Sequence, residues 1–208
     1  MRFSANTGFL WPELPFLDRI RAAARAGFDA VEFHDEAQAR ADIEAAIRVA
    51  DWVNAGAIHV LSGNTDAPEA AETLVSNLSY ALAQTDRVVL IEPICRAANP
   101  AYFLHDLDQA LGIQAQVNHP RLKLMFDCFH IETEHGDCAA RFRDVAPHVG
   151  HAQIAGFPGR NEPDTGALDY RSLLPAMRAA GYSGAFGAEY RPRNGTDAGL
   201  GWMSALRT

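Results

Sequence analysis

The stretch Val88-Val-Leu-Ile-Glu-Pro-Ile94 gives the clearest indication of the fold. It is a continuous apolar run that ends in a carboxylate and a proline, which is typical of a buried parallel strand that carries an acid at its C-terminal end. Three later stretches repeat this arrangement: Leu122-Lys-Leu-Met-Phe-Asp127, His151-Ala-Gln-Ile-Ala155 and Gly184-Ala-Phe-Gly-Ala-Glu-Tyr-Arg-Pro192. If the four strands are neighbours, four oxygen-bearing side chains converge. These are Glu92, Asp127, Gln153 and Glu189.

Strands and helices alternate along the whole chain. Further strands are predicted near residues 2–6, 29–34 and 57–63, and helices near 16–26, 35–54, 69–85, 100–117, 138–145, 170–180 and 196–206. This α/β alternation predicts a parallel sheet with helices outside it. The first strand lacks the glycine-rich turn of dinucleotide-binding folds, and the candidate site residues come from several strands. We therefore expect a TIM-type (βα) barrel that forms a single domain over residues 1–208, with its active site at the C-terminal ends of the strands.

Composition excludes several classes of partner. The 208 residues carry a net charge of −8, which disfavours a nucleic-acid partner or an anionic membrane surface. No apolar signal segment and no run of membrane-spanning length is present. The three cysteines, Cys95, Cys128 and Cys138, lack the paired spacing of a zinc or redox site, so reduced thiols in a cytoplasmic protein are expected.

Several motifs in the same order resemble a known family. The resemblance extends nearly from end to end, down to Ala198-Gly-Leu-Gly-Trp-Met203. The motifs are Arg2-Phe-Ser-Ala-Asn6, Ala26-Gly-Phe-Asp-Ala-Val-Glu-Phe33, Leu90-Ile-Glu-Pro-Ile94, Phe126-Asp-Cys-Phe-His130, Gly150-His-Ala-Gln-Ile-Ala155, Gly159-Arg-Asn-Glu-Pro163 and Ala188-Glu-Tyr-Arg-Pro192. On these motifs, the chain is similar to hydroxypyruvate isomerase and the 2-oxo-tetronate isomerases, which belong to the xylose-isomerase-like TIM barrels.

One region departs from the family. Between the strand at Val31 and the strand at Ile58, family members carry an additional helix, strand and long loop, whereas this chain continues from His34 into one helix. We expect a barrel shortened to about seven strands, at the lower end of the usual size for this fold. The missing wall would expose apolar surface, which predicts a homo-oligomer that covers it.

The resemblance implies a divalent metal and an isomerase reaction. Glu92, Asp127, Gln153 and Glu189 match the positions of the family's metal ligands, and an oxygen-rich ligand set suits Mg²⁺ or Mn²⁺. The implied activity is an intramolecular oxidoreduction, the aldose-ketose isomerisation of a small hydroxy-oxo acid such as hydroxypyruvate to tartronate semialdehyde. The metal would polarise the carbonyl, and an enediolate would form.

Five residues are candidates for catalysis or substrate binding. The family pattern implies that Glu92 and Glu189 act as the acid and base. His130 lies just past the Asp127 strand, where it could hydrogen-bond a substrate oxygen. Arg160 is the candidate for holding a substrate carboxylate, because a guanidinium offers two parallel donors, and Glu162 is the candidate for orienting it. The absence of a phosphate-cradling glycine loop predicts an unphosphorylated small molecule.

Other interpretations stay open at this point. The chain could be a C3 epimerase of a ketose, or a shortened and inactive barrel kept as a binding or assembly protein. An abasic-site nuclease of the same superfamily fits less well, because that chemistry needs clustered histidines and a basic face. His59 and His151 are interpreted as core or rim histidines, and the cysteines as small apolar fillers.

Overall fold

The computed structural model describes residues 1–32 and 39–207. The end of the predicted second strand and the start of the helix after it lie outside these residues. Contacts divide the chain into two compact units. Unit 1 comprises Met1–His34, Asp127–Pro147 and His151–Thr208, and unit 2 comprises Asp35–Phe126 and His148–Gly150.

Unit 1 contains a sheet of parallel strands. β1 (Phe3–Asn6) pairs with β2 (Ala30–Glu32) on one side and with β7 (Phe186–Ala188) on the other. β7 also pairs with β6 (Val149–Ile154), which begins in unit 2 and ends in unit 1. All three pairings are parallel, as the apolar runs separated by helices predict.

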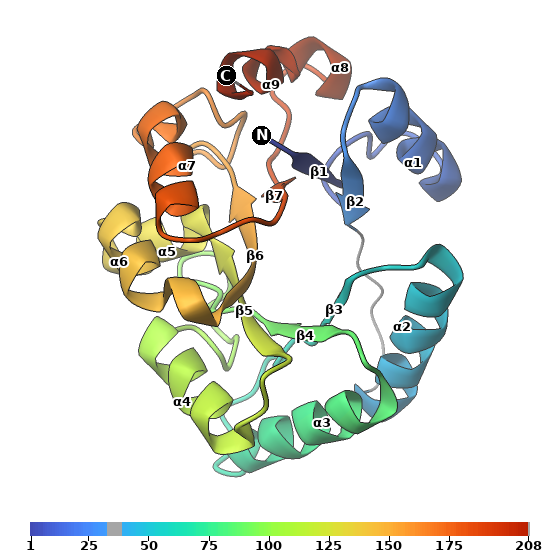
Figure 1. The fold of residues 1–208 in the computed structure, drawn as a ribbon, viewed down its shortest axis with the longest axis vertical. Helices are drawn as coiled ribbons and strands as arrows, with labels where there is room; N and C mark the ends of the chain where they lie inside the picture. The colour runs from blue at the N-terminus through green and yellow to red at the C-terminus, as the bar shows by residue number, and fades with distance from the viewer. Residues whose placement is uncertain (33–38, 208) are drawn as a thin grey trace. The chain divides into compact units, whose positions relative to one another are not determined.

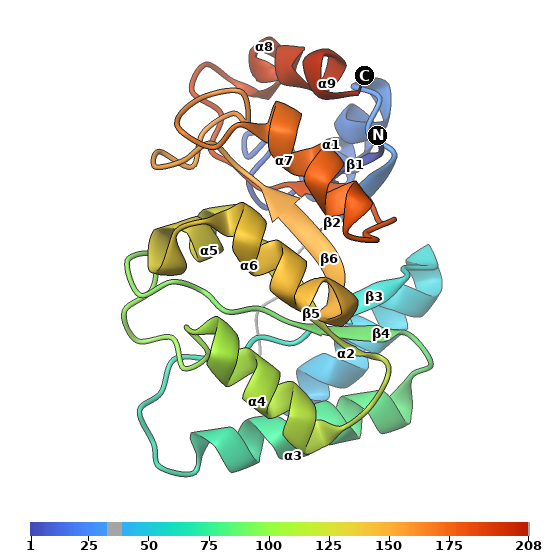
Figure 2. The ribbon, with the colours of Figure 1, turned by 60° about the vertical axis from the view of Figure 1, so that its left-hand side comes forward.

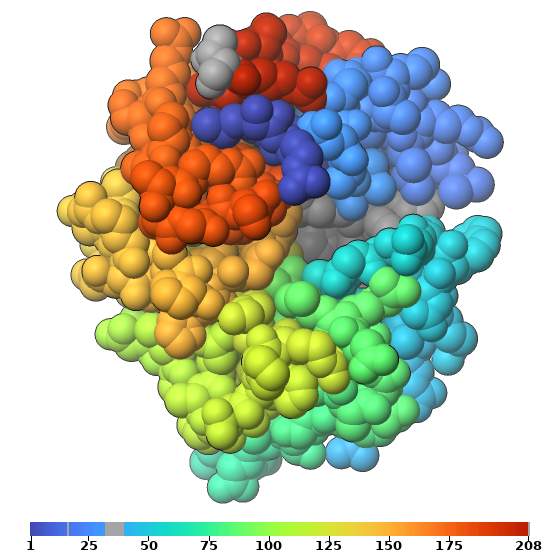
Figure 3. All heavy atoms as spheres, in the orientation of Figure 1, coloured from blue at the N-terminus to red at the C-terminus, as the bar shows by residue number. Residues whose placement is uncertain are grey.

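The helices of unit 1 cover this sheet, and α6 lies beside both α5 and α7 (Figure 1). The start of the chain, dark blue in Figure 3, reaches the surface beside the orange segment of α7, where Met1, Tyr170 and Pro175 line a shallow hollow. The helices are α1 (Phe16–Arg25), α5 (Cys128–His135), α6 (Cys138–Val145), α7 (Tyr170–Ala179), α8 (Thr196–Gly199) and α9 (Gly201–Leu206). The short 3₁₀ helix η1 (Ala146–His148) begins in unit 1 and ends in unit 2.

An aromatic cluster fastens the C-terminal helix to the first strand in unit 1. Trp202 is fully buried, and its ring packs edge-on against Phe3, Phe28 and Tyr190. The indole nitrogen donates a hydrogen bond of 3.1 Å to the Tyr190 hydroxyl. Buried aromatic rings with a satisfied polar atom contribute several kcal/mol each to a core, so this cluster holds the strand ends of unit 1 in place.

Unit 2 is built in the same way. β3 (Ala57–His59), β4 (Val88–Ile91) and β5 (Leu122–Asp127) pair in parallel, with β4 in the middle. In sequence order, the helices that pack on them are α2 (Ala39–Val53), α3 (Ala70–Gln84) and α4 (Leu107–Val117). α3 contacts both α2 and α4 (Figure 2).

The described residues bear out the shortened barrel. They form seven strands, as predicted, and those between Glu32 and Ala57 form one helix, α2, with no strand. Within its own unit β2 pairs with β1, and β3 pairs with β4. The additional strand and helix that the family carries between these two strands are therefore missing from the described chain.

The helix predicted over residues 100–117 is too long at its start. The structure begins α4 at Leu107, after Asp106, whose side chain accepts a hydrogen bond from the Gln109 backbone nitrogen. The Gln109 side chain in turn accepts from the His105 backbone nitrogen. Such reciprocal bonding fixes a helix start, and it overrides the apparent start at Pro100. In residues 1–32 and 39–207, no helix combines the length and apolar character needed to cross a membrane.

Candidate active site

Asp127 lies where β5 ends and α5 begins. The helix Cys128–His135 follows the strand directly, and sequence reasoning missed it. Asp127 caps this helix, because its Oδ1 accepts a 2.8 Å hydrogen bond from the Phe129 backbone nitrogen. The residue is 1% exposed, so both carboxylate oxygens sit in a buried environment. One oxygen is used by the helix cap, and the other faces the rest of the site.

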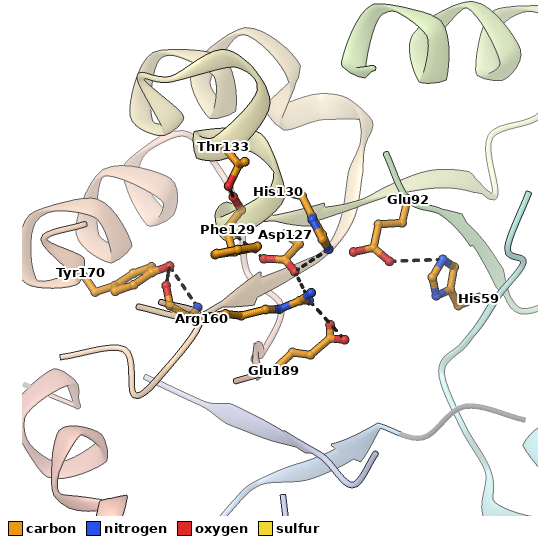
Figure 4. Close-up of polar contacts among 10 residues, drawn as sticks. His59, Glu92, Asp127, Phe129, His130, Thr133, Arg160, Tyr170 and Glu189 are labelled. Atoms are coloured by element: carbon orange, nitrogen blue, oxygen red, sulfur yellow. Dashed lines mark hydrogen bonds and ion pairs between the residues drawn. The ribbon is translucent and has the colours of Figure 1, made fainter. Parts of the chain in front are cut away.

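Arg160 contacts two of the predicted metal ligands in unit 1. Its Nη2 lies 2.8 Å from Asp127 Oδ2 and 3.4 Å from Glu189 Oε1. Figure 4 shows its side chain extending between the two carboxylates, which come from the ends of β5 and β7. The Arg160 side chain is only 12% exposed. Sequence reasoning placed Arg160 in the site but did not predict its pairing with Asp127 and Glu189.

The loop that presents Arg160 is tied to its surroundings. Gly156 and Asn161 form an antiparallel bridge across the loop, with a 2.8 Å hydrogen bond from Gly156 N to Asn161 O. The Arg191 backbone nitrogen donates a 2.7 Å hydrogen bond to the Arg160 carbonyl. Arg160 adopts a positive φ of 52°, which is uncommon for a residue with a side chain. These contacts fix the backbone at the position from which the guanidinium reaches the site.

Gln153 and Glu189 point to the same face of the unit 1 sheet. The register pairs Gln153 with Gly187, and Glu189 lies two residues beyond Gly187. Because side chains alternate along a strand, residues two apart share a face. Gln153 is fully buried and Glu189 is 6% exposed. The sequence prediction that these two oxygen-bearing residues end neighbouring strands is confirmed.

His130 lies in the first turn of α5 and is 2% exposed. Burial lowers the pKa of His130 to about 4, against the opposing effect of the nearby Asp127 carboxylate, and Arg160 lowers it further. The ring is therefore neutral at pH 7, and its Nε2 lies 3.6 Å from Asp127 Oδ2. A neutral imidazole can donate one hydrogen bond and accept another, which suits contact with a hydroxyl group.

Glu92 follows β4 in unit 2 and is 4% exposed. His59 ends the neighbouring strand, and its Nε2 lies 3.7 Å from Glu92 Oε2. The register pairs His59 with Leu90, so Glu92 lies two residues further along on the same face. Sequence reasoning interpreted His59 as a core or rim residue. Its position at a strand end, next to a strand that ends in an acid, was the signal that could have shown it as a neighbour of Glu92.

Glu162 is bound to Arg193 in unit 1. Its carboxylate accepts hydrogen bonds from the Arg193 backbone nitrogen at 3.0 Å and from Arg193 Nε at 2.9 Å. Burial alone would raise the pKa of Glu162, but these bonds outweigh it and lower the pKa below its usual value. The carboxylate thereby links the loop after β6 to the segment after β7. The sequence predicts that Glu162 orients Arg160, whereas the hydrogen bonds of its carboxylate come from Arg193.

These features define a class of protein. Parallel strands joined by helices carry buried acids and an amide at or next to their ends. The family described as the xylose isomerase-like TIM barrel matches residues 33–206.

Relatives of the chain narrow the class. The 2-oxo-tetronate isomerase of Cupriavidus necator is 35% identical, with 97% of each chain covered. The hydroxypyruvate isomerase of Escherichia coli K12 is 32% identical, with 100% of each chain covered. A crystal structure titled AP endonuclease, family 2, from Brucella melitensis superposes with a TM-score of 0.92 at 30% identity, covering 100% of this chain and 99% of that one. The chain belongs to the hydroxypyruvate isomerase and 2-oxo-tetronate isomerase family of these barrels, and it is an isomerase.

The relatives also confirm that this chain is short. The alignment with the Cupriavidus necator protein extends over 252 positions, but the chain has 208 residues, so at least 44 positions hold no residue of this chain. The alignment includes 97% of each chain, so these gap positions are internal to it. This agrees with the single described helix between β2 and β3.

Proposed function

We propose that this isomerase interconverts the aldose and ketose forms of a small hydroxy-oxo acid, as in the conversion of hydroxypyruvate to tartronate semialdehyde. The observation that carries the proposal is the buried group of Asp127, Arg160 and Glu189, which combines oxygen ligands with a cation suited to a carboxylate. The names of the aligned relatives support the same substrate class.

The residues of the site fit a divalent metal. Glu92, Asp127, Gln153 and Glu189 would hold Mg²⁺ or Mn²⁺, which prefer carboxylate and amide oxygens. In unit 1 the carboxylates of Asp127 and Glu189 are buried and lie within reach of one guanidinium nitrogen. Two buried carboxylates need positive charge nearby, which Arg160 supplies in part and a bound metal would supply more strongly. When bound, the metal would polarise the substrate carbonyl and acidify the adjacent C–H bond.

Glu92 and Glu189 are the proposed acid and base. One carboxylate removes a proton from the hydroxyl-bearing carbon, which gives an enediolate, and the other glutamate delivers a proton to the neighbouring carbon. The hydroxyl proton passes to the former carbonyl oxygen, so that a new carbonyl forms at the first carbon. The substrate and product are isomers, so no oxidant or reductant is consumed. Each glutamate follows a strand end and is at most 6% exposed, which excludes water from the proton transfers.

Two further residues would bind the substrate, and a third would support the site. Arg160 would hold the carboxylate through its paired donors, and the neutral His130 would hydrogen-bond a substrate oxygen. Glu162 would support the site by holding the segment that contains Arg193. The proposed site therefore contains one cation for the substrate's charge and one neutral donor for its hydroxyl groups.

We expect the enzyme to prefer hydroxypyruvate over dihydroxyacetone by at least about 100-fold in kcat/KM. The two compounds have the same number of carbon atoms, but dihydroxyacetone lacks the carboxylate. A buried charge-assisted pair contributes about 2–5 kcal/mol to recognition. The test is steady-state kinetics with both substrates at saturating Mn²⁺, on wild type and on Arg160→Met. The preference for hydroxypyruvate should be present in wild type and lost in Arg160→Met. Equal rates with both substrates in the wild type would exclude a hydroxy-oxo acid as the substrate class.

We also propose that the chain works as a single barrel domain in a cytoplasmic homo-oligomer, without a nucleic-acid or membrane partner. The net charge of −8 opposes binding to nucleic acid, which weighs against a nuclease activity. In unit 2, Trp52 is 84% exposed and Val53 is 47% exposed, which is unusual for large apolar side chains. A monomeric mass in light scattering would count against the oligomer.

A further inference from the structure

A cation of the protein itself already lies between two of the proposed metal ligands. Arg160 Nη2 is 2.8 Å from Asp127 Oδ2, which is hydrogen-bonding distance, and 3.4 Å from Glu189 Oε1. The Asp127 side chain is fully buried and the Glu189 side chain is 8% exposed. Buried carboxylates need a compensating charge, and Arg160 supplies it.

Two aromatic rings flank the guanidinium of Arg160. Its central carbon lies 5.1 Å from the centre of the Phe9 ring and 5.0 Å from that of the Phe129 ring. Aromatic faces attract a planar cation without fixing it through directed hydrogen bonds. The Arg160 backbone is held by its bond from Arg191, so a displacement would involve the side-chain torsions alone.

A divalent cation and this guanidinium compete for the same oxygen atoms. A metal ligated by Asp127 and Glu189 would take up the lone pairs that face Arg160 Nη2. It would also place a second positive charge next to the guanidinium, and the two cations would repel each other in a site of low polarity. The carboxylates can hold both only at a cost in affinity.

We propose that Arg160 is the resident counter-cation of the metal-free site, and that metal binding releases its guanidinium to bind the substrate carboxylate. The inference rests on the proposed function, because it takes Asp127 and Glu189 as metal ligands. It adds an order of events, in which the metal binds first and creates the carboxylate site. Linkage then requires that an anionic substrate and the metal strengthen each other's binding.

The test is Mn²⁺ binding, measured by calorimetry and by the electron paramagnetic resonance signal of free Mn²⁺, without any substrate. Arg160→Met removes the competing cation and should bind Mn²⁺ about tenfold more tightly than wild type. Arg160→Lys keeps a charge but loses the planar fork, so its affinity should lie between the two. Arg193→Met is the matched control, because it removes the same charge from the 56% exposed partner of Glu162. Its Mn²⁺ affinity should stay within about twofold of wild type, since exposed charges are screened.

A second readout follows Arg160 directly. In ¹⁵N spectra, the side-chain Nε–H signal that is missing in Arg160→Met should shift when Mg²⁺ is added to wild type. If Arg160→Met binds Mn²⁺ no more tightly than wild type, the counter-cation inference is wrong while the metal site stands. If wild type and all variants fail to bind Mn²⁺ at millimolar concentration, the metal centre of the proposed function is wrong as well.

Discussion

Replacing Glu189 with glutamine is expected to lower kcat by about 10²–10⁴-fold at saturating Mn²⁺. Glutamine has nearly the same size and keeps an oxygen that can face Arg160, so the site should retain its shape. It cannot accept a proton from a substrate carbon at neutral pH. The proton transfer assigned to Glu189 would therefore be lost while the buried strand end remains in place.

The measurement for Glu189→Gln combines kcat with the exchange of substrate hydrogen for solvent deuterium. Circular dichroism and urea unfolding show whether the variant folds like wild type. Raising the Mn²⁺ concentration should not restore the rate, because the missing function is proton transfer. A variant with more than about a tenth of wild-type kcat would remove Glu189 from the acid and base roles.

Asp127→Asn is expected to weaken Mn²⁺ binding by at least about 100-fold. Substitution of residues that only support a metal ligand already costs 10- to 100-fold, so loss of a direct carboxylate ligand should cost more. Asparagine is also a good helix cap, so the hydrogen bond from the Phe129 nitrogen at the start of α5 should persist. The effect on the fold should consequently be small.

Asp127→Asn and Glu189→Gln should differ in their response to metal. With Asp127→Asn, excess Mn²⁺ should restore kcat to within about tenfold of wild type, because Gln153 and both glutamates still offer oxygen ligands. Calorimetry gives the affinity, and a Mn²⁺ titration of the rate gives the rescue. Wild-type Mn²⁺ affinity in Asp127→Asn would show that this aspartate serves only the helix cap and the Arg160 pair.

The sequence was sufficient to predict which oxygen-bearing side chains lie at the ends of the strands. Gln153 and Glu189 lie at the ends of strand-like runs, so their places at strand ends were predictable, whereas the register that puts them on one face comes from the structure. Asp127 was predicted for the same reason. The shortened chain was also predictable, because the motifs on both sides of the missing segment remained in order.

The contacts of Arg160 could not be predicted in the same way. Its loop has no periodic pattern, and its position depends on a bridge between Gly156 and Asn161 and on a bond from Arg191, which follows another strand. The helix after Asp127 was missed because an aspartate that ends a strand can also cap a helix, and only the strand pattern was used. His59 was interpreted only as a core or rim residue, because its closeness to Glu92 depends on which strands are neighbours.

The most direct test of the proposed metal-dependent isomerase activity is product formation from hydroxypyruvate by the 208-residue protein. The protein is assayed with Mg²⁺ or Mn²⁺, then with a chelator, and then with the metal restored, and tartronate semialdehyde is identified by its mass and by ¹H spectra. We expect the formation of tartronate semialdehyde to stop on chelation and to resume when the metal is restored. Absence of product from the metal-loaded protein, with hydroxypyruvate and with four-carbon hydroxy-oxo acids, would contradict the proposed activity and would favour a binding role for this shortened barrel.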